Sequence, residues 1–122
     1  MKKDDFKNAF YARAYRYAIE IINFVEKIQR NDNAGQIIGK QLLRSGTSVT
    51  ANLVEAKSAS SKKDYINFYT HSLKSANESK LWIGLLRDTK KANHTESEKI
   101  LKETGELANI LAASIITMKN KR

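Results

Sequence analysis

The segment "GQIIGKQLLRSGTSVTANLVEA" (residues 35–56) decides the fold, because it has helical spacing although many of its side chains are small or polar. Positions on one face alternate in steps of four and three, the heptad pattern of packed helices. They are Ile38, Leu42, Ser45, Val49, Asn52 and Ala56. Gly39 and Gly46 also share a face, and Gly inside a helix costs about 0.5–1 kcal/mol relative to Ala. We expect close packing on a partner helix to compensate; simple tolerance of weak helix formers is the alternative.

Three further segments repeat apolar residues every three or four positions, which predicts helices. They cover roughly residues 4–31, 62–91 and 96–119, and the central segment becomes the second helix, roughly 34–58. Short polar breaks separate them: "NDNAG" (31–35), "KSASS" (57–61) and "KKANHT" (90–95). Long helices joined by short turns run antiparallel. The sequence therefore predicts an all-α, up-down-up-down antiparallel four-helix bundle that forms a single domain over residues 1–122.

The breaks also contain side chains that can cap helix N-termini by accepting hydrogen bonds from free backbone N–H groups. The candidates are Asp32 or Asn33 for the second helix, Ser61 with Asp64 for the third, and Thr95 with Glu98 for the fourth.

Composition excludes several classes of site. Cys is absent, so disulfides and thiolate metal sites cannot form. Only two histidines occur, His71 and His94, and neither belongs to the Glu-x-x-His motif of a di-iron bundle. We expect no metal, no cofactor and no small-molecule substrate. No signal peptide or membrane-spanning stretch is apparent, which indicates a cytoplasmic protein.

The chain is strongly basic, with a formal net charge of +9. Such a field favours anionic partners, nucleic acid first, although a basic surface can also serve only solubility. Antiparallel topology places the 57–63 turn at the same end as both termini, which gathers lysines there. The candidate nucleic-acid contacts are Lys2, Lys3, Arg13, Arg16, Lys57, Lys62, Lys63, Lys119, Lys121 and Arg122. Stacking of bases on aromatic rings is not expected, because most Tyr and Phe residues fall on core stripes.

A second candidate site surrounds Asn52, because a buried amide must be hydrogen-bonded and can fix register or oligomeric state. Glu55 follows one turn later, Ser48 and Arg44 precede it, and Glu78 is the acid expected across the bundle. The alternative is that Arg44, Glu55 and Glu78 are solvated surface charges.

The run "LLRSGTSVTANLVEAKSASSKKDYINFYTHSLKSANESKLWIGLL" (42–86) resembles the four-helix-bundle family of the 23S rRNA-intervening sequence protein. That family shows R-x-x-x-S-(I/V)-x-A-N-(I/L)-x-E-(G/A), then K-(D/E)-(F/Y), then S-x-x-E. The matching residues include Arg44, Ser48, Asn52, Glu55, Ser75 and Glu78; Ala56 stands where the family often has Gly. The resemblance implies a homopentameric ring and a link to RNA. Accessory variability determinant proteins of diversity-generating retroelements are similar bundles.

These observations predict a non-enzymatic, oligomeric bundle that binds RNA or a ribonucleoprotein through its basic surface. The alternative is a structural or adaptor ring that binds a protein partner. A third interpretation is an RNase, because Arg87 and His94 resemble the Arg-x4–6-His pair of HEPN domains. His could act as a general base, but His94 falls in a predicted turn.

Overall fold

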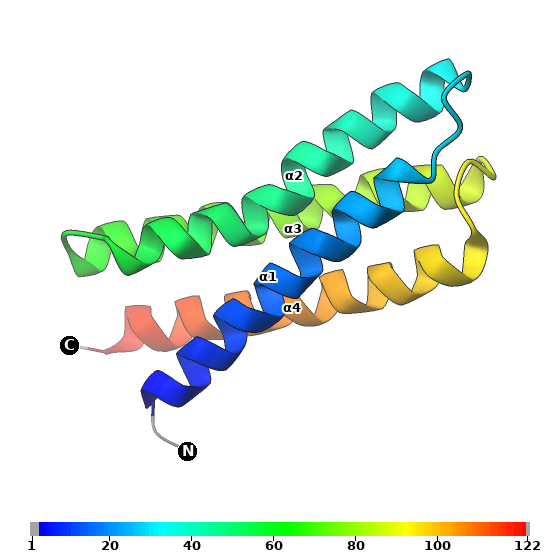
Figure 1. Ribbon diagram of the computed structural model, residues 1–122. Coiled ribbons are helices and arrows are strands. Elements are labelled where there is room, and N and C mark those ends of the chain that lie inside the picture. Colours follow the sequence, from blue (N-terminus) through cyan, green and yellow to red (C-terminus); the bar gives the residue numbers. More distant parts are fainter. Residues whose placement is uncertain (1–2, 122) are drawn as a thin grey trace.

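The computed structural model describes residues 3–121, which form four α-helices. The helices are α1 (Lys3–Glu26), α2 (Asn33–Lys57), α3 (Lys62–Asp88) and α4 (His94–Asn120). Consecutive helices run in opposite directions, so the α2–α3 turn lies at the same end of the bundle as the start of α1 and the end of α4 (Figure 1). This arrangement confirms the predicted antiparallel four-helix bundle. Among residues 3–121, none of the four helices has an apolar stretch of the length that a membrane span requires.

Helix α1 ends at Glu26, earlier than the predicted end near residue 31. After Glu26 the backbone forms a tighter turn, in which the N–H of Ile28 donates to the carbonyl of Val25, three residues earlier, at 3.1 Å. This turn keeps Ile28 in the core at 4% exposure. The side chain of Gln36 then donates to the carbonyls of Ile28 and Gln29 at 3.2 and 3.0 Å, which satisfies acceptors that a longer helix would have used.

Two of the predicted caps are present and one is wrong. The Asp32 carboxylate accepts from the N–H of Gly35 at 2.9 Å, and the Ser61 hydroxyl accepts from the N–H of Asp64 at 3.1 Å. At the fourth helix the cap is Asn93, whose side chain accepts from the N–H of Glu96 at 2.9 Å. Helix α4 therefore begins earlier than predicted, because Asn caps a helix at least as well as Thr does.

The glycines of α2 explain how α1 and α2 approach. A methyl group added at Gly46 would meet Cγ2 of Ile21 at 2.8 Å, and one added at Gly39 would meet Cδ1 of Ile28 at 2.7 Å. The close helix packing expected from the sequence is therefore present, and the partner is α1 of the same chain. Helix α1 crosses the bundle obliquely (Figure 1) and packs mainly on α2, with far less contact to α4.

Where α1 does meet α4, a buried polar contact joins them. The hydroxyls of Tyr17 and Thr104 lie 2.6 Å apart, and both side chains are fully buried. Thr104 donates its own proton to the carbonyl of Ile100 at 2.6 Å, so Tyr17 is the donor in the pair. Burial raises the pKa of Tyr17 to about 12, which keeps the phenol protonated at neutral pH.

Candidate functional site

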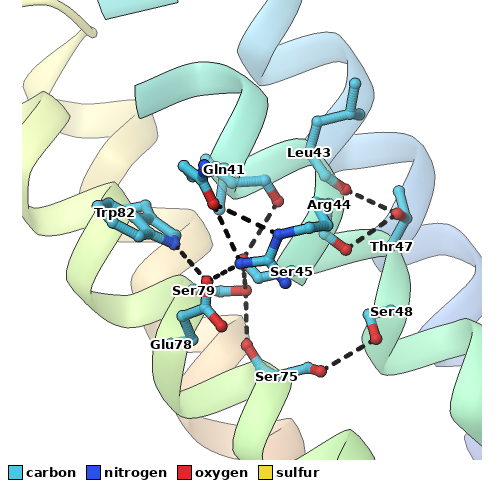
Figure 2. Close-up of polar contacts among 11 residues, drawn as sticks. Gln41, Leu43, Arg44, Ser45, Thr47, Ser48, Ser75, Glu78, Ser79 and Trp82 are labelled. Carbon is cyan, nitrogen blue, oxygen red and sulfur yellow. Dashed lines mark hydrogen bonds and ion pairs between the residues drawn. The ribbon is translucent and has the colours of Figure 1, made fainter. Parts of the chain in front are cut away.

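Hydroxyl side chains line the interface between α2 and α3 (Figure 2). The hydroxyls of Ser45 and Ser79 lie 2.8 Å apart and both residues are fully buried. Ser79 donates to the carbonyl of Ser75 at 2.8 Å, so Ser45 donates to Ser79. One turn further, Ser72 donates to the carbonyl of Val49 at 2.8 Å. Small side chains let the two helices approach, and each of these hydroxyls finds a partner in another serine or in a backbone carbonyl.

An ion pair covers this row of serines. The structure brings Arg44 of α2 and Glu78 of α3 into direct contact, and Arg44 also donates to the side chain of Gln41 at 3.2 Å. Glu78 accepts a second hydrogen bond from the indole N–H of Trp82 at 2.9 Å. Figure 2 shows the Glu78 carboxylate between Arg44 and Trp82. We call this group of side chains, together with the serines beneath it, the polar seam. It consists of Arg44, Ser45, Ser48, Ser72, Ser75, Glu78, Ser79 and Trp82.

Asn52 is not the buried amide that the sequence analysis expected. It is partly exposed, and Leu53 occupies the fully buried position instead. The Asn52 amide donates to the carbonyl and the hydroxyl of Ser48, each at 2.9 Å, and Ser48 in turn accepts from Ser75 at 3.1 Å. No buried side-chain nitrogen or oxygen among the described residues lacks a hydrogen-bond partner. The amide is therefore satisfied within its own chain.

Glu55 does not join the polar seam. It is exposed, and within residues 3–121 it forms no ion pair and no side-chain hydrogen bond.

The basic end of the bundle holds five of the predicted nucleic-acid contacts. They are Lys57, Lys62, Lys63, Lys119 and Lys121, and all five are exposed. The ammonium group of Lys62 donates to the carbonyl of Lys121, which ties the α2–α3 turn to the end of α4. The ammonium group of Lys57 lies 4.0 Å from the centre of the Tyr11 ring. We use "basic end" for these five lysines. Lys2 and Arg122 lie outside the described residues, and Lys3 is described only as the first backbone position of α1.

The two predicted arginine contacts lie elsewhere along α1. Arg13 donates to both carboxylate oxygens of Glu103 at 2.8 and 2.6 Å and to Glu106 at 3.3 Å. These hydrogen bonds raise the pKa of Arg13 above its ordinary value and neutralise its charge locally. Arg13 therefore joins α1 to α4 and is not free to bind phosphate. Arg16 is exposed and has no ion pair among the described residues.

The tyrosines beside the basic end were not among the predicted site residues. The rings of Tyr65 and Tyr69 stack with centroids 4.9 Å apart, and the hydroxyl of Tyr65 donates to that of Tyr69 at 3.2 Å. Burial raises the pKa of both Tyr69 and Tyr11 well above the ordinary value. The i,i+4 spacing of Tyr65 and Tyr69 was a usable signal, because side chains four apart are neighbours on a helix.

Arg87 and His94 converge on one carboxylate. Arg87 donates to Asp88 at 2.7 Å and to an oxygen of Glu98 at 2.9 Å, and His94 lies 3.6 Å from that same oxygen. The hydrogen bond with Asp88 raises the pKa of Arg87 and lowers that of Asp88. His94 is the first residue of α4 and does not lie in a turn as predicted. Within residues 3–121, no cluster of three His, Asp or Glu side chains could hold a metal ion.

The fold and these sites define a small basic four-helix bundle with a serine-lined seam between its second and third helices. The family model of the 23S rRNA-intervening sequence protein matches residues 7–113. The chain belongs to the 23S rRNA-intervening sequence protein family.

A solved structure has the same fold. The crystal structure of a protein of unknown function from the S23 ribosomal protein family of Bacteroides thetaiotaomicron matches with a TM-score of 0.81 and 33% sequence identity. The match covers 87% of this chain and 97% of that chain. No curated protein matches this sequence.

Proposed function

We propose that this protein is a non-enzymatic, oligomeric bundle that binds RNA or a ribonucleoprotein through its basic end. The observation that carries the proposal is which lysine and arginine side chains form ion pairs and which do not. The arginines and lysines that pair with acids lie along the sides of the bundle or at its other end; they are Arg13, Lys27, Arg44, Arg87 and Lys91. None of the five lysines of the basic end pairs with a carboxylate within residues 3–121. Other described cations, such as Arg30 and Lys90, are also unpaired, so the proposal rests on five unpaired lysines gathered at one end. Such a cluster favours binding of a phosphate backbone.

Fluorescence anisotropy with a labelled RNA hairpin at 50 mM salt tests this proposal. We expect the variant Lys57→Gln/Lys62→Gln/Lys63→Gln/Lys121→Gln to lose most of its affinity. A matched control, Lys74→Gln/Lys80→Gln/Lys99→Gln/Lys102→Gln, removes four charges from the sides of α3 and α4 and should keep most of it. Absence of wild-type binding at this salt concentration would favour the adaptor ring that binds a protein.

Self-association is supported by a separate feature, an apolar stripe on the outer face of α1. Tyr15, Ile19 and Ile22 are 64%, 45% and 40% exposed and follow one another at helical spacing. Exposed apolar stripes of this kind mark protein interfaces. The ring of five subunits is the assembly that the family resemblance implies, and we propose that this stripe forms the contact between subunits.

Sedimentation velocity tests the stripe. Ile19→Glu should reduce the oligomer to smaller species at micromolar concentration, whereas Leu81→Glu, at a similarly exposed position of α3, should not. A wild-type monomer, or dissociation caused only by Leu81→Glu, would refute this contact.

We propose that Arg87 and His94 do not cleave RNA. Two carboxylates hold the Arg87 guanidinium, and the His94 imidazole lies beside one of them. A negatively charged neighbour disfavours approach of a phosphodiester. Incubation of wild type and His94→Ala with RNA should therefore show no cleavage by either; cleavage that His94→Ala abolishes would contradict this view.

A further inference from the structure

A groove of about 730 Å³ opens between the first turns of α1, the start of α3 and the end of α4. Figure 1 shows that α1 runs obliquely toward this end of the bundle. Its apolar walls come from all three helices and include Phe6, Phe10, Tyr65, Tyr69, Ile110 and Met118. Phe10 and Tyr69 are buried and form its floor, whereas Phe6 is 52% exposed at its rim. The groove is thus an opening in the side of the hydrophobic core.

The charged side chains among the described lining residues all have one sign. They are Lys7, Lys62 and Lys121, and none of the described lining residues is Asp or Glu. Lys62 is held at the rim by its hydrogen bond to the carbonyl of Lys121. Lys7 lies 4.9 Å from the centre of the Tyr65 ring. An apolar cleft of this volume with a few fixed polar groups is the usual form of a small-ligand site, and clefts between the helices of bundles are a common place for one.

The walls favour an aliphatic or compact apolar body over an RNA base. A base would need a free aromatic face for stacking. Tyr65 already stacks on Tyr69 and carries the Lys7 ammonium group over its ring. The other aromatic rings of the lining are Phe6, which is at the rim, and Phe10, which is buried; α4 contributes largely methyl and methylene groups. Burial of apolar surface would supply the affinity, and the ammonium groups would select a negative head group.

We propose that this groove binds an amphipathic anion: an apolar body of small-molecule size with one acidic head group, such as a long-chain carboxylate. The body lies against Phe6, Phe10 and Met118, and the head group faces the lysines at the rim. This site overlaps the phosphate contacts of the proposed RNA function, because Lys62 and Lys121 belong to both.

Two fluorescent probes that differ by one sulfonate group test the proposal. They are 1-anilinonaphthalene-8-sulfonate and its neutral analogue N-phenyl-1-naphthylamine, each titrated into the full chain. We expect one saturable sulfonate site per chain, at least 10-fold tighter than binding of the neutral probe. Decanoate should displace the sulfonate. Lys62→Gln/Lys121→Gln should remove most of the preference for the charged probe.

A groove-filling substitution separates this site from nonspecific probe binding. Ala113 is exposed and lines the groove, so Ala113→Trp should abolish saturable binding while circular dichroism shows an intact fold. Ala51→Trp, at an exposed position on α2, should leave binding unchanged. Equal affinity for both probes, or binding that Ala113→Trp does not weaken, would overturn the proposal. A stoichiometry far below one probe per chain that rises when the protein is diluted would also overturn the proposal. That result would mean that a second copy of the chain fills the groove at high protein concentration.

Discussion

Ser45 and Ser79 share a buried hydrogen bond of 2.8 Å across the interface of α2 and α3, and this contact explains the composition of the central segment. Leucines at these positions would hold the two helices farther apart. Serines allow close approach, and each hydroxyl finds a partner in the facing helix or in its own backbone. Buried hydroxyls that lack a partner are costly, so this interface depends on the pairing.

A double-mutant cycle on these serines should show coupling. Ser79→Ala leaves the Ser45 hydroxyl with only a 3.4 Å contact to the carbonyl of Leu42, so it should cost about 1–3 kcal/mol of unfolding free energy. Ser45→Ala should cost less, because Ser79 still donates to Ser75. The double variant should be about 0.5–1.5 kcal/mol more stable than the sum of the two effects predicts. Urea denaturation measures all three variants; strict additivity would contradict the pairing.

Glycine substitutions should separate close packing from helix propensity. Gly84→Ala and Gly105→Ala meet no atom within 4 Å, so each should raise the unfolding free energy by about 0.5–1 kcal/mol. Gly46→Ala gains the same propensity but drives its methyl group into both γ carbons of Ile21 at 2.8 and 2.9 Å. A net loss of about 1–2 kcal/mol follows from overpacking. In thermal unfolding, Gly84→Ala should have the highest melting temperature, wild type an intermediate one and Gly46→Ala the lowest. An increase in melting temperature in Gly46→Ala would refute the close approach of α1 to α2.

The ion pair of Arg44 and Glu78 should contribute little to stability. Their side chains are 58% and 34% exposed, and pairs with such exposure contribute about 0–1 kcal/mol. Arg44→Ala should therefore change the unfolding free energy by less than about 1 kcal/mol. Trp82 donates to Glu78, so its fluorescence emission should shift in Glu78→Ala and stay near wild type in Glu55→Ala. A loss of several kcal/mol in Arg44→Ala would show that the seam is a major stabilising element.

The pair of Asp32 and Lys91 predicts an acid-dependent loss of stability. The Lys91 ammonium group contacts the two carboxylate oxygens of Asp32 at 2.8 and 3.0 Å. This contact, together with the hydrogen bond from the N–H of Gly35, lowers the pKa of Asp32 in the folded state. A lowered pKa means that this contribution is complete above the unfolded-state value of about 4 and is lost as pH falls through the folded-state value. The melting temperatures of wild type and Asp32→Asn should differ at pH 6, and the difference should shrink as pH falls through the folded-state pKa of Asp32. A constant difference would contradict this.

The fold was predictable from sequence because apolar periodicity and short breaks leave few alternatives for four long helices. The burial of Asn52 was mispredicted for a geometric reason. The buried face of α2 does repeat every seven residues, but through Gly39, Gly46 and Leu53 and through Leu42, Val49 and Ala56. Ile38 and Asn52 lie beside this face and are partly exposed. Gly39 and Gly46 carry no side chain, so the apolar spacing placed the face one residue too early.

The contacts of individual cations were less predictable. Arg13 meets Glu103 only because of the register and rotation of α1 against α4, which no local pattern encodes. The hydrogen bond between Trp82 and Glu78 could have been predicted from the sequence, because the two residues are an i,i+4 pair on one helix. The basic end followed from topology alone, whereas the groove beside it depends on the oblique course of α1.

Amide chemical-shift mapping with an RNA hairpin tests the central claim, RNA binding by the basic end, most directly. Spectra at 50 mM salt should show the largest changes in residues 57–64 and 117–121, and these changes should fade as salt rises to 250 mM, because binding that releases counterions weakens steeply with salt. Changes centred on the opposite end, at residues 27–33 and 89–94, or no changes at all, would contradict it.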